Sequence, residues 1–294
     1  MSAEPVSIQW FPGHMTKARR IMKENLRHVD LVVELRDARI PASSKNPEIE
    51  KLLEGKKRVI LLGKSDMADP DATNSWLGHL SSRGIPVLAV DCRSGKGLRA
   101  FAPMVTRLLE PETEKRKRRG LVGVPLRLMA VGVPNVGKSS FINRMASAKR
   151  TRVEDRPGVT RGRQWVKIDG GMELLDMPGV LWPKFEEKRV GEHLAFTGAV
   201  KDDVTDTEAL AARLLERLAA DYPALLGMRY RLNENIIKEG AGNALLEAVG
   251  MARGMLLPGG EIHTERAAVM VLDEFRGGLI GRITLELPGT EGKK

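Results

Sequence analysis

The chain has 294 residues, 42% of them hydrophobic, which allows one large or two medium domains with a buried core. Its single cysteine, Cys92, excludes an internal disulfide and favours a reducing compartment. The formal net charge of +10 favours an anionic partner, nucleic acid first, although an ordinary basic surface gives the same bias. No apolar run reaches the length of a signal core or a membrane span, so we expect a cytoplasmic protein without a membrane partner.

The first third of the chain alternates short apolar runs with polar stretches of helical length. Runs rich in Val, Ile and Leu predict buried strands at 30–35, 58–63 and 86–91. Polar stretches predict helices at 46–55, 71–83 and 97–109. Because strands and helices alternate, the sequence predicts a mostly parallel sheet with flanking helices.

Residues 110–125, "EPETEKRKRRGLVGVP", mix proline, glycine and a dense run of charge. This composition predicts a solvated linker over 111–125, and a direct contact with RNA is the alternative.

A second set of elements follows this linker. We expect a strand at 126–132, a helix from Lys138, and strands at 163–169 and 172–177 that form an antiparallel hairpin around Gly170 and Gly171. Beyond residue 200, leucines at helical spacing and punctuating glycines indicate a small all-helical domain. The predicted division is an α/β domain over 1–204, with halves 1–110 and 126–204, and a helical domain with a short tail over 205–294.

The stretch "GVPNVGKSS" at 132–140 fits the phosphate-binding pattern G-x-x-x-x-G-K-[ST], with a predicted strand before it and a helix after it. Gly132 and Gly137 permit a tight backbone path, so that consecutive N–H groups and a helix N-terminus can surround an anion. Lys138 supplies charge to the β- and γ-phosphates, and Ser139 offers a hydroxyl to Mg²⁺. The motif predicts a nucleoside triphosphate site, the P-loop.

Two further segments follow the P-loop at suitable distances. "ELLDMPG" ends a predicted strand with Asp176, which can hold Mg²⁺ through water, and the Gly179 N–H can contact a γ-phosphate. "RPGVTRG" contains Thr160, which can add a second hydroxyl to Mg²⁺ when its loop closes. Either segment alone could be a turn, but the three motifs in this order indicate a nucleotide switch.

The part that reads the base lies upstream of the P-loop. "GKSD" at 63–66 follows a predicted strand, and "AVDCRSGKG" follows the next strand, where a base-contacting loop is expected. The motif order is therefore base reader, base loop, P-loop, Thr160 and Asp176, which is the order of a GTPase that has been circularly permuted. The sequence predicts a circularly permuted P-loop GTPase domain followed by the helical domain.

This arrangement resembles the circularly permuted GTPases of the ribosome biogenesis GTPase A group, also called YlqF/RbgA. The segments "IQWFPGHMTKARR", "DARIP", "GVPNVGKSS", "PGVTRGRQW", "DMPGVLWP", "DYPALLGMRYRL" and "GRITLE" are similar to that family over nearly the whole chain. The resemblance implies a GTPase that binds GTP and GDP with Mg²⁺ and acts late in assembly of the large ribosomal subunit. It implies as partners the precursor large subunit and its rRNA, and we expect a monomer when the protein is free.

The resemblance also gives roles to residues that no motif assigns. Val180 follows the switch glycine where many GTPases carry a water-orienting Gln, and His14 is the family's candidate for that task, although it could instead cap or pack the N-terminal segment. Asn135 resembles the asparagine of potassium-stimulated GTPases, which would make it a K⁺ ligand, or it is a turn-forming residue. The catalytic candidates are His14, Lys138 and Thr160. The candidate metal ligands are Ser139, Thr160 and Asp176 for Mg²⁺ and Asn135 for K⁺. The candidate nucleotide contacts are Lys64, Ser65, Asp66, Cys92, Arg93, Ser94, Pro134, Asn135, Val136, Gly137, Lys138, Ser139, Ser140, Thr160, Asp176 and Gly179.

The base-reading half departs from the family pattern at three positions. Gly63 stands where the family has an Asn that contacts the base and helps tie the base loop to the P-loop, and Cys92 and Arg93 stand where Ser and Ala are common. We expect Asp66 to keep the guanine preference, with weaker affinity, which disfavours an ATP-dependent enzyme. The remaining alternative is an RNA-binding module with a weak or vestigial nucleotide site.

Overall fold

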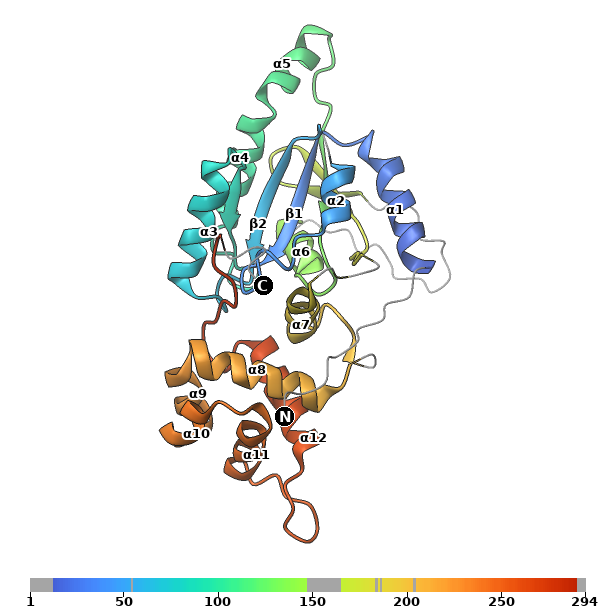
Figure 1. Ribbon diagram of the computed structural model, residues 1–294. Coiled ribbons are helices and arrows are strands. Elements are labelled where there is room, and N and C mark those ends of the chain that lie inside the picture. Colours follow the sequence, from blue (N-terminus) through green and yellow to red (C-terminus); the bar gives the residue numbers. More distant parts are fainter. Residues whose placement is uncertain are drawn as a thin grey trace. The chain divides into compact units, whose positions relative to one another are not determined.

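The computed structural model describes residues 13–53, 55–146, 165–182, 185, 187–202 and 205–289, and for 13–19 it describes the backbone alone (Figure 1). These residues form two compact units. The sheet unit contains the described residues up to 182 together with 284–289, and the helical unit contains those between 185 and 283. Among the described residues, every helix is too short or too polar to cross a bilayer.

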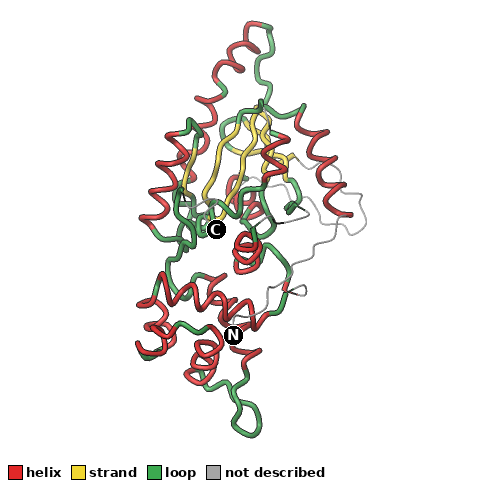
Figure 2. The backbone as a smooth tube through the Cα atoms, viewed as in Figure 1, coloured by secondary structure: helices red, strands yellow, loops and turns green. Residues whose placement is uncertain are grey.

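The sheet unit is built on six strands in the order β3-β2-β1-β4-β6-β5. Figure 2 shows the strands of this unit in yellow and its helices in red. Neighbouring strands are parallel except for β5 and β6, which are antiparallel. The strand bounds are β1 (Leu31–Asp37), β2 (Arg58–Gly63), β3 (Val87–Ala89), β4 (Leu126–Val131), β5 (Trp165–Ile168) and β6 (Met172–Asp176). The predicted fold class is confirmed, and the predicted glycine turn at 170–171 joins the antiparallel pair.

Central strand β1 is buried along its whole length, with apolar residues at its start and the buried charged residues Glu34, Arg36 and Asp37 toward its end. The helices of this unit are α1 (Gly13–Leu26), α2 (Pro47–Leu52), α3 (Pro70–Ser82), the 3₁₀ turn η1 (Leu98–Ala100), α4 (Phe101–Leu108), α5 (Glu110–Arg118) and α6 (Lys138–Met145). One buried cluster joins Met22 of α1 and Ile49 of α2 to β4, and another joins Trp76 of α3 to Ile60 of β2. Burial of these side chains provides the main force that fixes the sheet and its loops.

Part of the predicted linker at 111–125 is helical instead. Helix α5 has no buried residue, so hydrophobic packing does not explain it. It is attached at its base, where Lys57 Nζ donates to the Leu108 carbonyl at 2.8 Å and lies 2.9 Å from Glu112, while Arg116 Nη2 lies 2.5 Å from Asp30. Side chains from earlier strands and loops therefore support a helix that composition alone could not indicate.

The helical unit contains α7 (Lys188–Phe196), α8 (Thr207–Asp221), α9 (Pro223–Tyr230), α10 (Glu234–Glu239), α11 (Gly242–Ala252) and α12 (Thr264–Gly277). The predicted leucine stripe of α8, Leu210, Leu214 and Leu218, is fully buried. The unit begins about 20 residues earlier than the expected boundary at 205, because α7 packs against α8 and α12.

The short tail after Ile283 returns to the sheet unit, whereas the sequence suggested that it belongs with the helical domain. The Glu286 carboxylate accepts the N–H groups of Ala42 at 2.7 Å and Ser43 at 3.0 Å, together with the Ser43 hydroxyl. The Glu286 carbonyl accepts Trp76 Nε1–H at 2.9 Å, and the Leu285 N–H donates to the Arg39 carbonyl at 2.8 Å. The tail is therefore attached to the loop that follows β1 and to helix α3.

Candidate nucleotide-binding site

The predicted motifs meet at one edge of the sheet. Strands β1, β2, β4 and β6 run parallel, so their carboxyl ends, at Asp37, Gly63, Val131 and Asp176, all lie at the same edge. Loops at the carboxyl ends of parallel strands form the usual ligand crevice of open α/β sheets. The structure thus brings the base reader, the P-loop and the Asp176 segment into one site despite their order along the chain.

The P-loop joins β4 to α6 with the backbone path that the motif requires. Gly137 precedes the first turn of α6 with φ 101°, and a Cβ on Gly132 would lie 2.6 Å from the Leu35 carbonyl oxygen. Glycine is therefore needed at both positions. Lys138 is buried, 8% exposed, and its Nζ donates to the Val133 carbonyl at 3.2 Å, which holds the ammonium against the loop.

The Asp176–Gly179 segment lies against the P-loop. A Cβ on Gly179 would lie 2.8 Å from Pro134 Cα and 3.1 Å from Lys138 Nζ, so only glycine permits this approach. The Val180 N–H donates to the Gly132 carbonyl at 3.2 Å, which joins the two segments. The Gly179 backbone and the Lys138 ammonium are thus adjacent, as a site for a terminal phosphate requires.

Asp176 and Lys138 influence each other's protonation. Burial lowers the pKa of Lys138, and the nearby Asp176 carboxylate opposes that shift. Asp176 is exposed, but partial desolvation of its carboxyl still raises its pKa, and Lys138 opposes that shift in turn. Loss of solvent therefore disfavours the charged form of each group, and the opposite charge of its partner offsets part of that cost.

The Lys64 backbone, directly after β2, has φ 56°, which is uncommon for a residue with a side chain. Its Nζ lies 3.0 Å from Asp37 Oδ2, and Arg39 binds the same carboxylate through Nε at 2.9 Å and Nη2 at 2.8 Å. Burial raises the pKa of Asp37, but Arg39 and Lys64 together outweigh it and hold the pKa well below its ordinary range. This buried charge cluster fixes the start of the base-reading segment.

Asp66 lies opposite the loop that follows β3. Arg93 Nη2 is 3.0 Å from Asp66 Oδ2, and the two side chains are 74% and 23% exposed. Asp91 shapes the loop by accepting the N–H groups of Arg93 at 2.7 Å and Ser94 at 3.2 Å. Burial, with Asp91 and Asp66 beside it, raises the pKa of the Cys92 thiol to about 11, so this cysteine is a neutral, inert side chain at neutral pH.

Some predicted site residues lie where the structure gives less detail. Thr160 lies outside the described residues, and His14 is on helix α1 with only its backbone described. Asn135 is exposed and adopts φ 55°, and Ser139 and Ser140 are exposed at the start of α6. The roles of His14 and Thr160 therefore stay predictions.

Sequence reasoning missed the residues that support the site rather than form it. Asp37, Asp91 and Asn46 hold backbone or side-chain groups of the motifs, and Asn46 Nδ2 donates to the Val180 carbonyl at 2.8 Å. The available signal was position, since Asp37 and Asp91 stand at or just after the ends of predicted strands, at the functional edge of the sheet. Asn46 caps α2 with its side-chain oxygen, and its amide N–H pairing could not be read from the sequence.

The fold and the site define a P-loop GTPase whose base-reading motif precedes its phosphate-binding motifs. A family model described as "50S ribosome-binding GTPase" matches residues 127–215. Ribosome biogenesis GTPase A of Priestia megaterium is 45% identical, with 96% of this chain and 98% of that protein aligned. Mitochondrial ribosome-associated GTPase 1 of Bos taurus is 33% identical, with 97% and 90% aligned. The chain belongs to the ribosome biogenesis GTPase A family.

Solved structures agree with this assignment. GNP-bound YlqF from T. maritima matches with a TM-score of 0.65 at 25% identity, over 93% of this chain and 99% of that one. The GDP-bound form of that protein matches with a TM-score of 0.60 at 25% identity, over 92% and 99% of the two chains. These two structures of a relative hold GNP and GDP, which supports guanine nucleotide binding, while the role of Asp66 in base recognition stays a prediction.

Proposed function

We propose that this chain binds and hydrolyses GTP while it assists late maturation of the large ribosomal subunit, where it contacts the precursor particle and its rRNA. The observation that carries the proposal is the convergence of Lys138, Gly179 and Asp176 on one P-loop, with Asp66 at a neighbouring strand end. The names of the relatives supply the ribosomal context.

The site residues divide the nucleotide between them. The Asp66 carboxylate would accept the N1–H and N2–H groups of guanine, which adenine does not offer in that pattern. The P-loop N–H groups and Lys138 would hold the β- and γ-phosphates, and the Gly179 N–H would contact the γ-phosphate. The base and phosphate halves would thereby recognise one GTP molecule or its product GDP.

The oxygen donors at the site fit Mg²⁺, which prefers hard oxygen ligands and keeps several of its waters. The Ser139 hydroxyl and the Asp176 carboxylate are both exposed at this edge, and Thr160 would supply a further hydroxyl. The exposed Asn135 amide oxygen fits a K⁺ ion near the phosphates. These cations would offset the charge that develops on the phosphates during hydrolysis.

The attacking water needs a group outside the usual switch position. Val180 is 5% exposed and apolar, so it cannot orient water. We assign that task to His14, whose imidazole can accept a proton near neutral pH. Lys138 and Thr160 complete the catalytic set by stabilising phosphate charge.

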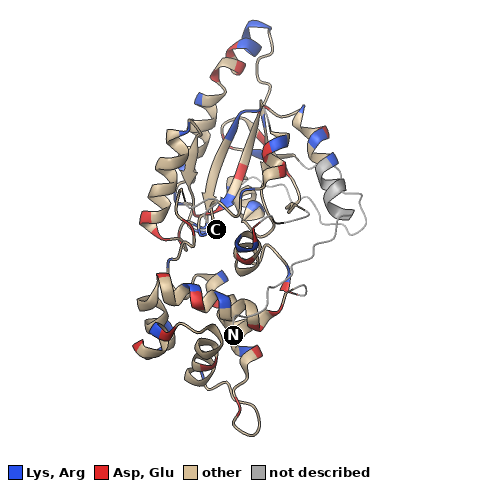
Figure 3. Cartoon of the chain, viewed as in Figure 1, with Lys and Arg blue, Asp and Glu red and all other residues tan. Residues whose placement is uncertain are grey.

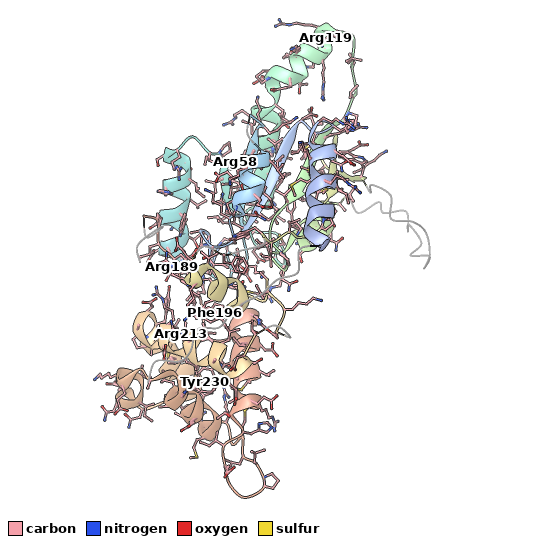
Figure 4. All side chains as sticks on the ribbon, turned by 45° about the vertical axis from the view of Figure 1, so that its right-hand side comes forward. Arg58, Arg119, Arg189, Phe196, Arg213 and Tyr230 are labelled. Atoms are coloured by element: carbon pink, nitrogen blue, oxygen red, sulfur yellow. The ribbon has the colours of Figure 1, made fainter. Side chains whose placement is uncertain are left out.

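The ribosomal partner would be held partly through phosphate contacts. In Figure 3 the blue colour of lysine and arginine positions is concentrated near the end of α5, and Figure 4 places Arg119 at that end. Lys115, Arg118 and Arg119 are exposed there. Such side chains displace counterions from RNA, so binding should weaken as salt rises. The free protein would be a monomer.

Co-sedimentation with precursor large subunits tests the proposal. We expect tighter binding with a non-hydrolysable GTP analogue than with GDP, by about 1–3 kcal/mol as for other coupled sites, and weaker binding at higher salt in both states. The particle should in turn accelerate GTP hydrolysis. Equal binding in all nucleotide states, without acceleration, would leave only an RNA-binding protein with a vestigial nucleotide site.

A further inference from the structure

The base loop, residues 91–97, depends on the P-loop helix for its position. Arg144 Nη2, in the last turn of α6, donates to the Ser94 carbonyl at 2.8 Å. Helix α6 begins at Lys138, so one short helix carries a phosphate-binding lysine at its first residue and a base-loop contact near its end. The base loop and the P-loop are therefore joined through α6 as well as through the sheet.

Gly95 is the residue that permits this contact. It adopts φ 88°, and a Cβ there would lie 2.9 Å from Arg144 Nη2 and 3.2 Å from Arg144 Nε. The guanidinium thus lies against the loop backbone at a position where a side chain would displace it. Glycine at position 95, whose positive φ favours it in any case, leaves room for the Arg144 guanidinium beside the loop backbone.

Gly63 makes this contact more important. A Cβ added to Gly63 would lie 3.4 Å from the Val136 carbonyl oxygen of the P-loop and 3.6 Å from the Arg36 carbonyl oxygen, both ordinary van der Waals distances. A polar side chain at this position would therefore reach the P-loop backbone from the base-reading strand. With glycine there, position 63 supplies no side-chain link between the two halves of the site.

We propose that Arg144 is a positioning residue for base recognition, which holds the base loop at the correct distance from the P-loop in place of a side chain at position 63. Arg144 acts through the Ser94 carbonyl and does not itself bind the nucleotide. The base loop, whose Arg93 and Ser94 N–H groups are already bonded to Asp91, is then held within reach of the base while the same helix binds the phosphates. This inference rests on the proposed binding of GTP.

The test is a double-mutant cycle between Arg144→Ala and Gly63→Asn, with the Kd of a fluorescent GDP and the GTP-to-ATP selectivity as readouts. In the wild-type background, Arg144→Ala should weaken guanine nucleotide binding about tenfold, as expected for loss of a hydrogen bond from a charged donor. In the Gly63→Asn background, the same change should cost about threefold or less, because the new side chain restores a link to the P-loop. Selectivity for GTP over ATP should fall with affinity in the first case.

Arg99→Ala is the matched control, because Arg99 is an exposed arginine that lines a cavity together with Ser94 and Arg144 but makes no bond to the Ser94 carbonyl. Arg99→Ala should leave Kd within about twofold, and Arg144→Lys should retain part of the affinity. Equal losses for Arg144→Ala and Arg99→Ala, or an equal cost of Arg144→Ala in both backgrounds, would overturn the inference. If Gly63→Asn does not fold, the test rests on Arg144→Ala, Arg144→Lys and Arg99→Ala, each checked for an unchanged Tm. Their Kd values still show whether Arg144 supports base recognition. A wild-type chain that binds no guanine nucleotide would instead refute the proposed function.

Discussion

The two halves of the nucleotide site are built in different ways. The phosphate half, from β4 to Gly179, uses glycines, backbone N–H groups and one buried lysine, and it retains every feature of its motif. The base half, from β1 to the base loop, relies on side-chain pairs: Asp37 with Lys64 and Arg39, Asp66 with Arg93, and Asp91 with its own loop. Backbone recognition tolerates little variation, whereas side-chain recognition can change one residue and compensate with another.

The largest loss of nucleotide affinity should come from a substitution in the phosphate half, Lys138→Ala. Lys138→Ala removes a buried ammonium that would make charge-assisted bonds to two phosphates, so GTP and GDP affinity should fall on the order of a thousandfold. Nucleotide titration by calorimetry measures the loss, with circular dichroism to verify folding. If Lys138→Ala still binds GTP tightly, the phosphates do not bind at the P-loop, and the description of this half as the phosphate site is wrong.

The base loop should protect its thiol strongly. With a pKa of about 11, the Cys92 thiol stays protonated at neutral pH, and the thiolate is the reactive form. Against an ordinary cysteine, alkylation by iodoacetamide at pH 8 should be on the order of 200-fold slower, rising about tenfold per pH unit up to pH 10. Intact-mass spectrometry follows the reaction at the chain's single cysteine. If Cys92 is alkylated at the same rate in native and denatured protein at pH 8, burial and the neighbouring carboxylates of Asp91 and Asp66 do not suppress its thiolate.

Asp66→Asn should alter selectivity more than overall binding. The carboxylate accepts two donors of guanine, so its loss should cost GTP affinity about 10- to 150-fold, while xanthine nucleotides, which present the complementary pattern, should bind better than they do to the wild type. Parallel titrations with GTP, XTP and ATP measure this. A uniform loss for all three nucleotides would mean that Asp66 shapes the site without reading the base.

The smallest expected effect is a modest gain in GTP affinity, caused by the removal of the Arg93 side chain. The Arg93 guanidinium presents to Asp66 the same kind of N–H donors as the guanine edge, so it competes with the base for that carboxylate. Arg93→Ala should tighten GTP binding by up to about fivefold, the range of an exposed ion pair. Lys96→Ala, which removes an equal charge from the same loop, should not have this effect. Weaker binding after Arg93→Ala would show instead that Arg93 supports the base.

The same contrast explains which features the sequence could predict. The P-loop and the Asp176 segment were predictable because each needs particular residues at fixed spacing, and the strand runs were predictable because burial on both faces demands continuous apolar residues. Helix α5 was not, because it depends on Lys57 and Asp30, which are distant in sequence. Neither was the role of Glu286, whose partners Ala42 and Ser43 lie more than 240 residues away.

The return of the tail to the sheet unit changes the helical unit from a terminal appendage into an inserted loop of about 100 residues, closed at both ends. A chain segment joined at one end can swivel about a single bond, whereas a segment joined at two ends can move only in ways that keep both junctions in place. The hydrogen bonds of residues 284–286 therefore remove orientational entropy that a single linker would leave. A nick in the tail should return that freedom while the strands and loops of the nucleotide site stay covalently intact.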